Sequence, residues 1–141
     1  MANEITITKY KDEVTPFLES LLERLPGEAD NLVNNVGEVF LEYLQEYTPI
    51  GCTHELYSRT EMTVTGLLSR LIDSSAAHFP FNVLGTSPHW IGSSIFICGV
   101  GWRYIGEHPG TQPNDYPSLA FMDGLGPAEN VADEWLNNLL E

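Results

Sequence analysis

Apolar residues recur at helical spacing along the first third of the chain, and this pattern constrains the fold most. Residues 14–25 are predicted to form a helix that starts at Thr15-Pro16 and ends at Pro26-Gly27. A second helix is predicted to begin near Glu28 to Asp30, where acids suit the positive end of the helix dipole, and to end at Pro49-Ile50-Gly51. Its apolar face comprises Leu32, Val36, Val39, Phe40, Tyr43, Leu44 and Tyr47.

The periodicity changes after Leu56. Apolar and Thr residues alternate over residues 62–68, which predicts a strand that continues to about Asp73. Residues 74–83 are predicted as one short helix, interrupted or tightened at Pro80. Residues 94–98 and 102–105, joined by Gly99-Val100-Gly101, predict a β-hairpin.

A closing helix is predicted after the Pro- and Gly-rich stretch of residues 107–127. Its apolar face comprises Val131, Trp135, Leu136, Leu139 and Leu140. The order of elements predicts an α+β fold, with N-terminal helices packed on a small, mostly antiparallel sheet and a C-terminal helix. We divide the 141 residues into an N-terminal extension with a short helix (1–27) and one α+β domain (28–141).

The charge is strongly negative: 20 acidic residues stand against 6 basic ones, for a net charge of −14. Such a surface repels phosphates and disfavours ordinary nucleic-acid binding. Solubility, the lining of a passage through which DNA slides, imitation of DNA, and a halophilic source all remain open explanations. Glu38, Glu42 and Glu46 follow one another at i, i+4 and i+8, and form a candidate acidic face toward passing DNA. A plain solvated helix face is the ordinary alternative.

Catalytic templates are incomplete. The chain has no phosphate-binding glycine loop and no Gly-x-Ser-x-Gly motif. Cys52 and His54 are two residues apart, and this spacing alone does not bring a nucleophile and a base into hydrogen-bonding reach. Cys52 and Cys98 are expected to be buried free thiols. The four histidines lack metal-site spacing, although His89 and His108 converging in a metal-assisted hydrolase stays open. We expect a protein that is not an enzyme and has no catalytic residues, cofactor or metal.

Residues 85–91 and residues 108–117 each combine Gly, Pro and Thr with one His. This composition predicts two rigid, specifically shaped loops. Left-handed backbone is most expected at Gly85 and Gly110. The candidate determinants of local shape or contact are Gly85, Thr86, Pro88, His89, His108, Pro109, Gly110, Thr111 and Pro113.

The chain resembles the small neck and tail-completion proteins of long-tailed phages, the family of the lambda-type minor tail protein Z. The resemblance covers about residues 28–140 and lies in an ordered set of segments. These are Tyr47-Thr48-Pro49-Ile50-Gly51, Leu56-Tyr57-Ser58-Arg59-Thr60, residues 79–89 ending in Gly85-Thr86-Ser87-Pro88-His89, and His108-Pro109-Gly110-Thr111-Gln112-Pro113. The helix of residues 14–25 has no counterpart in the family.

The resemblance implies a virion protein of the head–tail neck, made in the host cytoplasm. It implies a homo-oligomeric ring that contacts head-closure or connector proteins and tail-terminator or tail-tube proteins, and through which genomic DNA passes without specific binding. No membrane partner is expected, because the longest apolar runs are far shorter than the ~20 residues of a membrane span. The alternative function is an acidic DNA mimic that occupies a DNA-binding partner.

Overall fold

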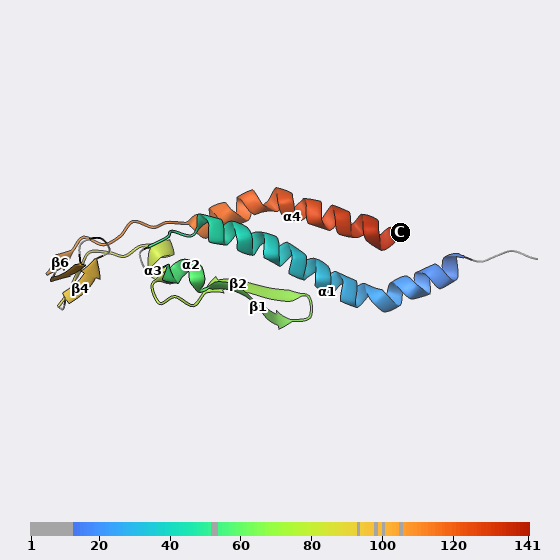
Figure 1. The fold of residues 1–141 in the computed structure, drawn as a ribbon, viewed down its shortest axis with the longest axis horizontal. Helices are drawn as coiled ribbons and strands as arrows, with labels where there is room; N and C mark the ends of the chain where they lie inside the picture. The colour runs from blue at the N-terminus through green and yellow to red at the C-terminus, as the bar shows by residue number, and fades with distance from the viewer. Residues whose placement is uncertain (1–12, 52–53, 93, 98, 100, 105) are drawn as a thin grey trace, which may run out of the picture.

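The computed structural model describes residues 13–51, 54–92, 94–97, 99, 101–104 and 106–141. Two long helices and a β-hairpin form the body, and a narrow arm extends from one end (Figure 1). The α+β class is confirmed. The strands of the described part form three separate two-stranded antiparallel sheets.

Helix α1 (Val14–Tyr47) is a single helix of 34 residues, so the predicted helix end at Pro26-Gly27 is wrong. Pro26 cannot donate a backbone hydrogen bond, but contacts with the C-terminal helix hold the chain helical on both sides of it. The Arg24 guanidinium donates to the Leu139 carbonyl at 2.9 Å, and the Trp135 indole N–H donates to the Glu28 carbonyl at 3.0 Å. The helix bends within its blue segment in Figure 1, as expected at an interior proline.

The continuity of α1 also changes the interpretation of its first acids. Glu28 and Asp30 lie in the interior of the helix, so the prediction that they face its positive dipole end is wrong. The division between residues 27 and 28 falls inside this helix.

Helix α4 (Tyr116–Leu140) begins well before the predicted closing helix and contains Pro127 in its interior. The Asp115 carboxylate caps its start by accepting the Ser118 N–H at 3.4 Å, and Pro117 occupies the first turn. The prediction of an irregular stretch up to Pro127 is therefore wrong for its second half. Proline and glycine are common in loops, but Pro117 lies in the first turn of α4, where proline is compatible with a helix.

Helices α1 and α4 run antiparallel along the length of the body (Figure 1). They approach closely at Gly124, where an added β-carbon would lie 2.9 Å from Cδ1 of Phe40. The Phe40 and Phe121 rings stack beside this point, with centroids 4.8 Å apart. The absence of a side chain at Gly124 thus permits the aromatic contact that joins the two helices.

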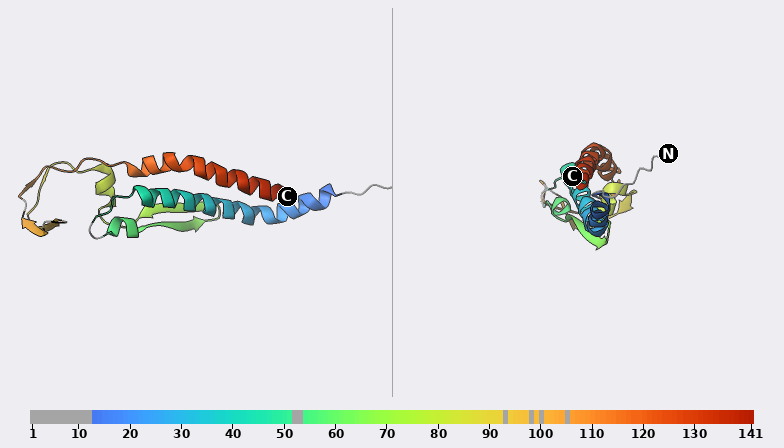
Figure 2. Two further views of the ribbon diagram at one scale, coloured as in Figure 1. Left: turned by 45° about the horizontal axis from the view of Figure 1, so that its top comes forward. Right: turned by 90° about the vertical axis from the view of Figure 1, so that its right-hand side faces the viewer.

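Strands β1 (Thr60–Gly66) and β2 (Ser69–Ser74) form a hairpin along α1, on the side away from α4 (Figures 1 and 2). The predicted single strand to Asp73 is wrong, because the chain reverses at Leu67-Leu68. Neither leucine is a typical turn residue, and Leu68 adopts a positive φ of 58°. The turn is stabilised from α1, since the Asp30 carboxylate accepts the Leu68 N–H at 2.9 Å.

Arg70 clamps this hairpin to α1. Its guanidinium makes two parallel hydrogen bonds to the Asp30 carboxylate, at 3.1 and 3.0 Å, and a third to Oδ1 of Asn34 at 3.2 Å. The Arg70 side chain is only 7% exposed, so the pair is shielded on one side. Hydrogen bonds from Arg70 hold the pKa of Asp30 below its usual value.

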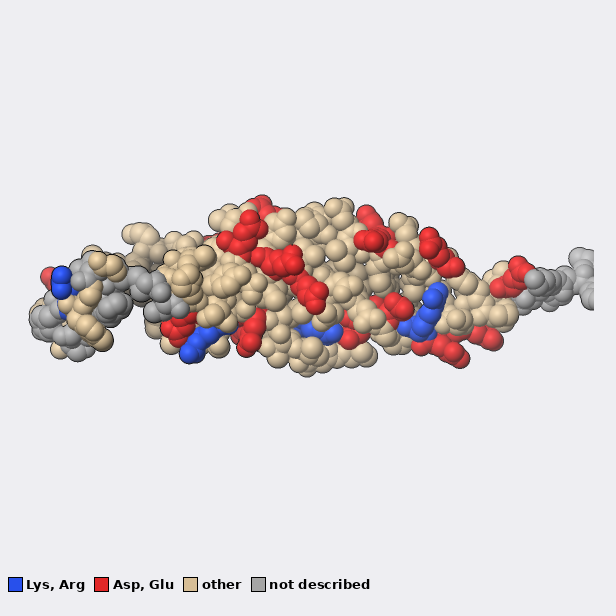
Figure 3. Space-filling view, viewed as in Figure 1, with Lys and Arg blue, Asp and Glu red and all other residues tan. Residues whose placement is uncertain are grey.

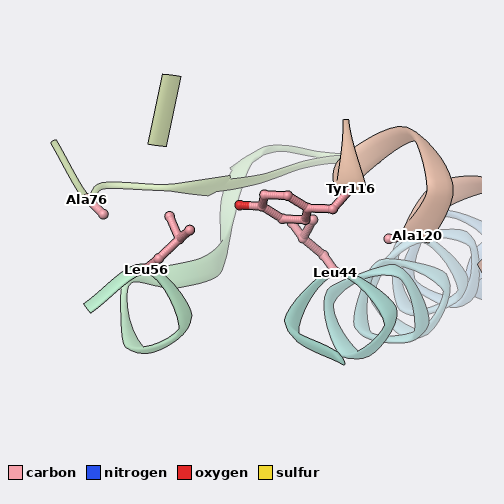
Figure 4. Packing of buried hydrophobic residues seen from close by; sticks show 5 residues of the cluster. All are labelled: Leu44, Leu56, Ala76, Tyr116 and Ala120. Atoms are coloured by element: carbon pink, nitrogen blue, oxygen red, sulfur yellow. The ribbon is translucent and has the colours of Figure 1, made fainter. Parts of the chain in front are cut away.

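A small core lies where α1, α4 and the short helix α2 (Glu55–Ser58) meet. The Tyr116 ring extends from the start of α4 over Leu44 and toward Leu56 (Figure 4). Burial raises the pKa of the Tyr116 phenol. No large side chain in the described part is less than 2% exposed, so this core is shallow.

The arm leaves the body after helix α3 (Phe79–Leu84), in which Pro80 lies in the first turn. Its stalk pairs β3 (His89–Trp90) with β6 (Glu107–His108). Its tip pairs β4 (Ser94–Ile97) with β5 (Gly101–Tyr104), which confirms the predicted hairpin. Cys98, Val100 and Ile105, also part of that prediction, lie outside the described residues.

Candidate functional site

The two candidate loops, 25 residues apart in sequence, pair with each other at the base of the arm. Thr86 and Thr111 form an antiparallel bridge in which each N–H donates to the other's carbonyl at 3.0 Å. Their hydroxyls lie 3.1 Å apart, and the Thr111 N–H also reaches the Thr86 hydroxyl oxygen at 3.0 Å. The two loops therefore form the two paired strands at the base of the arm.

Gly85 and Gly110 permit the close approach of the two strands. Their φ angles are +73° and +85°, which confirms the prediction of left-handed backbone at both positions. An added β-carbon at Gly110 would lie 2.2 Å from the Thr86 carbonyl oxygen, and one at Gly85 would lie 2.6 Å from that of Thr111. Because the obstructing atoms are backbone, neither position accommodates a side chain without separating the strands.

The prolines of the two loops lie beside these glycines. A β-carbon at Gly85 would also lie 2.8 Å from the nitrogen of Pro113, and one at Gly110 would lie 3.1 Å from that of Pro88. Pro109 is exposed on the stalk, next to His108. Proline at these positions restricts the backbone where the strands touch, so the base of the arm is stiff.

His89 and His108 face each other in register across the stalk, with ring centroids 5.0 Å apart. Nδ1 of His89 lies 2.8 Å from the Ser87 carbonyl oxygen, and Nδ1 of His108 accepts the Gly110 N–H at 3.0 Å. The convergence of these two histidines is confirmed. The described residues offer no group of three or more His, Cys, Asp or Glu side chains placed to hold a metal ion.

A concavity of about 750 Å³ opens between α3 and the base of the arm. Its lining includes His78, Phe81 and Asn82 of the α3 segment, with residues of both loops. Three of the four histidines of the chain thus line one hollow, and Oδ1 of Asn82 is buried without a hydrogen-bond donor among the described residues. Sequence reasoning missed His78, Phe81 and Asn82, since only the turn of the chain after α3 brings them to the arm.

The candidate acidic face lies on the solvent-exposed side of α1, where Glu38, Glu42 and Glu46 are all exposed. Acidic side chains cross the middle of the body on the face shown in Figure 3. Residues 78–114, which include the arm, contain one acidic residue, Glu107. Glu38 accepts a hydrogen bond from the Asn34 amide at 3.1 Å. These three acids lie on the body, apart from the paired loops of the arm.

The Cys52–His54 pair cannot be placed, because Cys52 lies outside the described residues, as does Cys98. His54 precedes α2 in left-handed conformation, with φ of 52°. Within the described ranges, no helix has both the length and the apolarity needed to cross a membrane.

Comparison of the chain with protein-family models, with curated proteins and with solved structures found no match.

Proposed function

We propose that this protein is a virion structural protein of the head–tail connector of a tailed virus. In this proposal it is a subunit of a ring that joins the capsid to the tail and surrounds the DNA passage. The observation that carries the proposal is the amount of apolar surface that a single copy leaves uncovered. A chain whose large side chains are mostly half-exposed gains much of its burial from neighbours.

This apolar surface extends over both ends and the long sides of the elongated molecule. Side chains of α1, of α3, of the arm and of α4 contribute to it. Examples are Leu22 (70% exposed), Leu84 (74%), Trp90 (69%) and Met122 (64%). Apolar surface on both ends and on the long sides supports a subunit with several neighbours rather than a single partner.

The arm supports the same function. It is a stiff two-stranded projection whose base is fixed by the Thr86–Thr111 bridge and by the two glycines. Its outer part contributes little to the core of its own body, which lies among α1, α2 and α4. A projection of this kind is suited to contact an adjacent protein, and adjacent rings are the contacts expected at a viral neck.

The acidic face is compatible with a passage for DNA, because weak repulsion of phosphates prevents the tight binding that a basic lining produces. The same exposed glutamates are also compatible with the DNA-mimic alternative, because a row of carboxylates presents negative charge to a basic surface. The acidic face therefore does not separate the two functions, and the test below does.

Location of the protein in virus particles tests the proposal. Neighbouring genes for portal, major capsid and tail-tube proteins are expected, and a gold-labelled antibody should mark the joint between head and tail of purified particles. A genetic setting without viral genes, or particles that lack the protein, would exclude this function. Displacement of DNA from a basic protein by the purified chain would favour the DNA mimic instead.

The DNA passage is tested separately by charge reversal. Particles carrying Glu38→Lys, Glu42→Lys and Glu46→Lys together should assemble but deliver their genome poorly, because a basic lining binds the moving DNA. Glu129→Lys with Asp133→Lys, on exposed positions of α4, is the matched control. Equal genome delivery by both variants would contradict a lining made by these three glutamates.

A further inference from the structure

The N-terminal part of α1 projects beyond the end of α4. The Leu139 carbonyl, at the last turn of α4, accepts a hydrogen bond from Arg24, so residues 14–23 extend past the helix pair (Figure 1). Ten helical residues span about 15 Å. We call this segment the α1 overhang.

The α1 overhang presents an amphipathic surface that its own body leaves uncovered. Phe17, Leu18 and Leu22 are 39%, 48% and 70% exposed. Leu18 and Leu22 lie one turn apart on the same face, and Glu19 and Glu23 lie beside them at the same spacing. The overhang is therefore an apolar stripe flanked by acids, a form that commonly enters an apolar groove.

The concavity beside α3 has the complementary character. Its volume of about 750 Å³ admits several side chains, and the exposed Phe81 ring (59%) lines it. Residues 78–114, which include the concavity and the arm, carry one Arg (Arg103) and one Glu (Glu107), for a net charge of zero with neutral histidines. The net −14 of the chain is thus carried by the other residues, and an acidic helix meets few like charges here.

These two surfaces lie at opposite ends of the elongated molecule (Figures 1 and 2), so they cannot meet within one copy. We propose that the α1 overhang of one copy occupies the concavity beside α3 of a second copy. This inference rests on the ring of the proposed function and identifies the contact between its subunits. A contact between two different surfaces is head-to-tail, and repetition of it produces a ring or a filament.

Disruption of each surface separately tests the contact. Leu18→Asp with Leu22→Asp alters the overhang, and Phe81→Asp alters the concavity. Leu67→Asp is the matched control, since Leu67 is equally exposed on the β1–β2 turn, away from both surfaces. Sedimentation over a range of concentrations should show association of the unchanged protein and of Leu67→Asp. Both surface variants should associate at least tenfold more weakly, with unchanged circular dichroism.

A mixture of the two surface variants gives the decisive result. The overhang variant keeps an intact concavity, and the concavity variant keeps an intact overhang. The mixture should therefore form dimers that do not grow further, although each variant alone stays monomeric. Dimers in the mixture identify a head-to-tail contact between two copies.

Three outcomes would overturn the inference: an unchanged protein that is monomeric throughout, surface variants that associate like Leu67→Asp, or a mixture that stays monomeric. The proposed function is affected differently. If the antibody labels the neck of virus particles but the overhang variant still forms rings, only this contact is excluded. If the two surface variants form mixed dimers but the protein is absent from virus particles, only the viral function is excluded.

Discussion

Replacement of Gly110 by Ala should open the base of the arm without unfolding the body. Its φ of +85° is a strained conformation for alanine, with a cost of about 1–3 kcal/mol. The new β-carbon would also lie 2.2 Å from the carbonyl oxygen of Thr86. Both atoms of this clash are held by the Thr86–Thr111 bridge, so the clash is relieved only when the bridge opens.

The bridge itself limits the size of the effect. The bridge contains two backbone hydrogen bonds of 3.0 Å, and each contributes about 0.5–1.5 kcal/mol. Opening the bridge loses these bonds but also removes the clash, so the loss of the bridge sets the upper limit of the effect. The free energy of opening should fall by about 1–3 kcal/mol, which corresponds to about 5- to 150-fold more open arm base. The melting temperature should change little, because the core residues Leu44, Leu56 and Tyr116 lie in the body.

Amide hydrogen exchange measures this opening directly. Protection of the Thr86 and Thr111 amides should fall by the stated factor in Gly110→Ala. Gly99→Ala is the matched control, because Gly99 has a similar φ of +81° at the tip of the arm, but in the described part of the chain nothing lies within 4 Å of an added β-carbon. Unchanged exchange at Thr86 and Thr111 in Gly110→Ala would refute the pairing of the two loops.

Three further tests, two of them with a control substitution, concern the body. Leu44→Ala, at a core position only 8% exposed, should lower the free energy of unfolding by about 2–5 kcal/mol, and Leu67→Ala, 72% exposed, should change it by under about 0.5 kcal/mol in urea titrations. Gly124→Leu should cost about 1–3 kcal/mol by separating α1 from α4, whereas Gly126→Leu, with open space around it, should not; equal thermal stability of the two would contradict the close helix contact. Asp30→Asn should lower the melting temperature at neutral pH. Hydrogen bonds from Arg70 lower the pKa of Asp30, so the ionised Asp30 carboxylate stabilises the fold fully above the usual carboxyl pKa of about 3.9. This stabilisation is lost as the pH falls through the lowered pKa of Asp30, so the melting temperatures of the two proteins should converge in acid.

Local patterns predicted those elements whose structure depends on neighbours in sequence. The apolar periodicity before Tyr47 located α1, and Gly99 with its flanking β-runs located the hairpin at the tip of the arm. The requirement for left-handed backbone at Gly85 and Gly110 was also visible, because such loops combine Gly and Pro. Each of these features is determined within a few residues.

The features that the sequence did not predict depend on contacts between distant residues. Pro26 and Pro127 were expected to lie outside helices, but the packing of α1 against α4 outweighs the local cost of each proline. The reversal at Leu67-Leu68 has no typical turn residue at its two central positions and is stabilised by Asp30, 38 residues away. No spacing of histidines indicates that His78 lies at the same concavity as the two arm loops.

The opposition between charge and apolar exposure determines the salt dependence expected of the proposed contact between copies. Each copy carries a net charge of −14, so two copies repel one another, but salt screens this repulsion beyond the Debye length, which is about 10 Å at 0.1 M salt and about 3 Å at 1 M. The proposed contact of Leu18 and Leu22 with Phe81 of a second copy is apolar, so it acts only at short range and does not weaken with salt. The concavity carries almost no acidic side chains, so the proposed contact contains little electrostatic attraction for salt to screen. Salt therefore mainly weakens the repulsion between the two acidic bodies. Higher ionic strength therefore favours association, the opposite of its effect on a contact made by salt bridges.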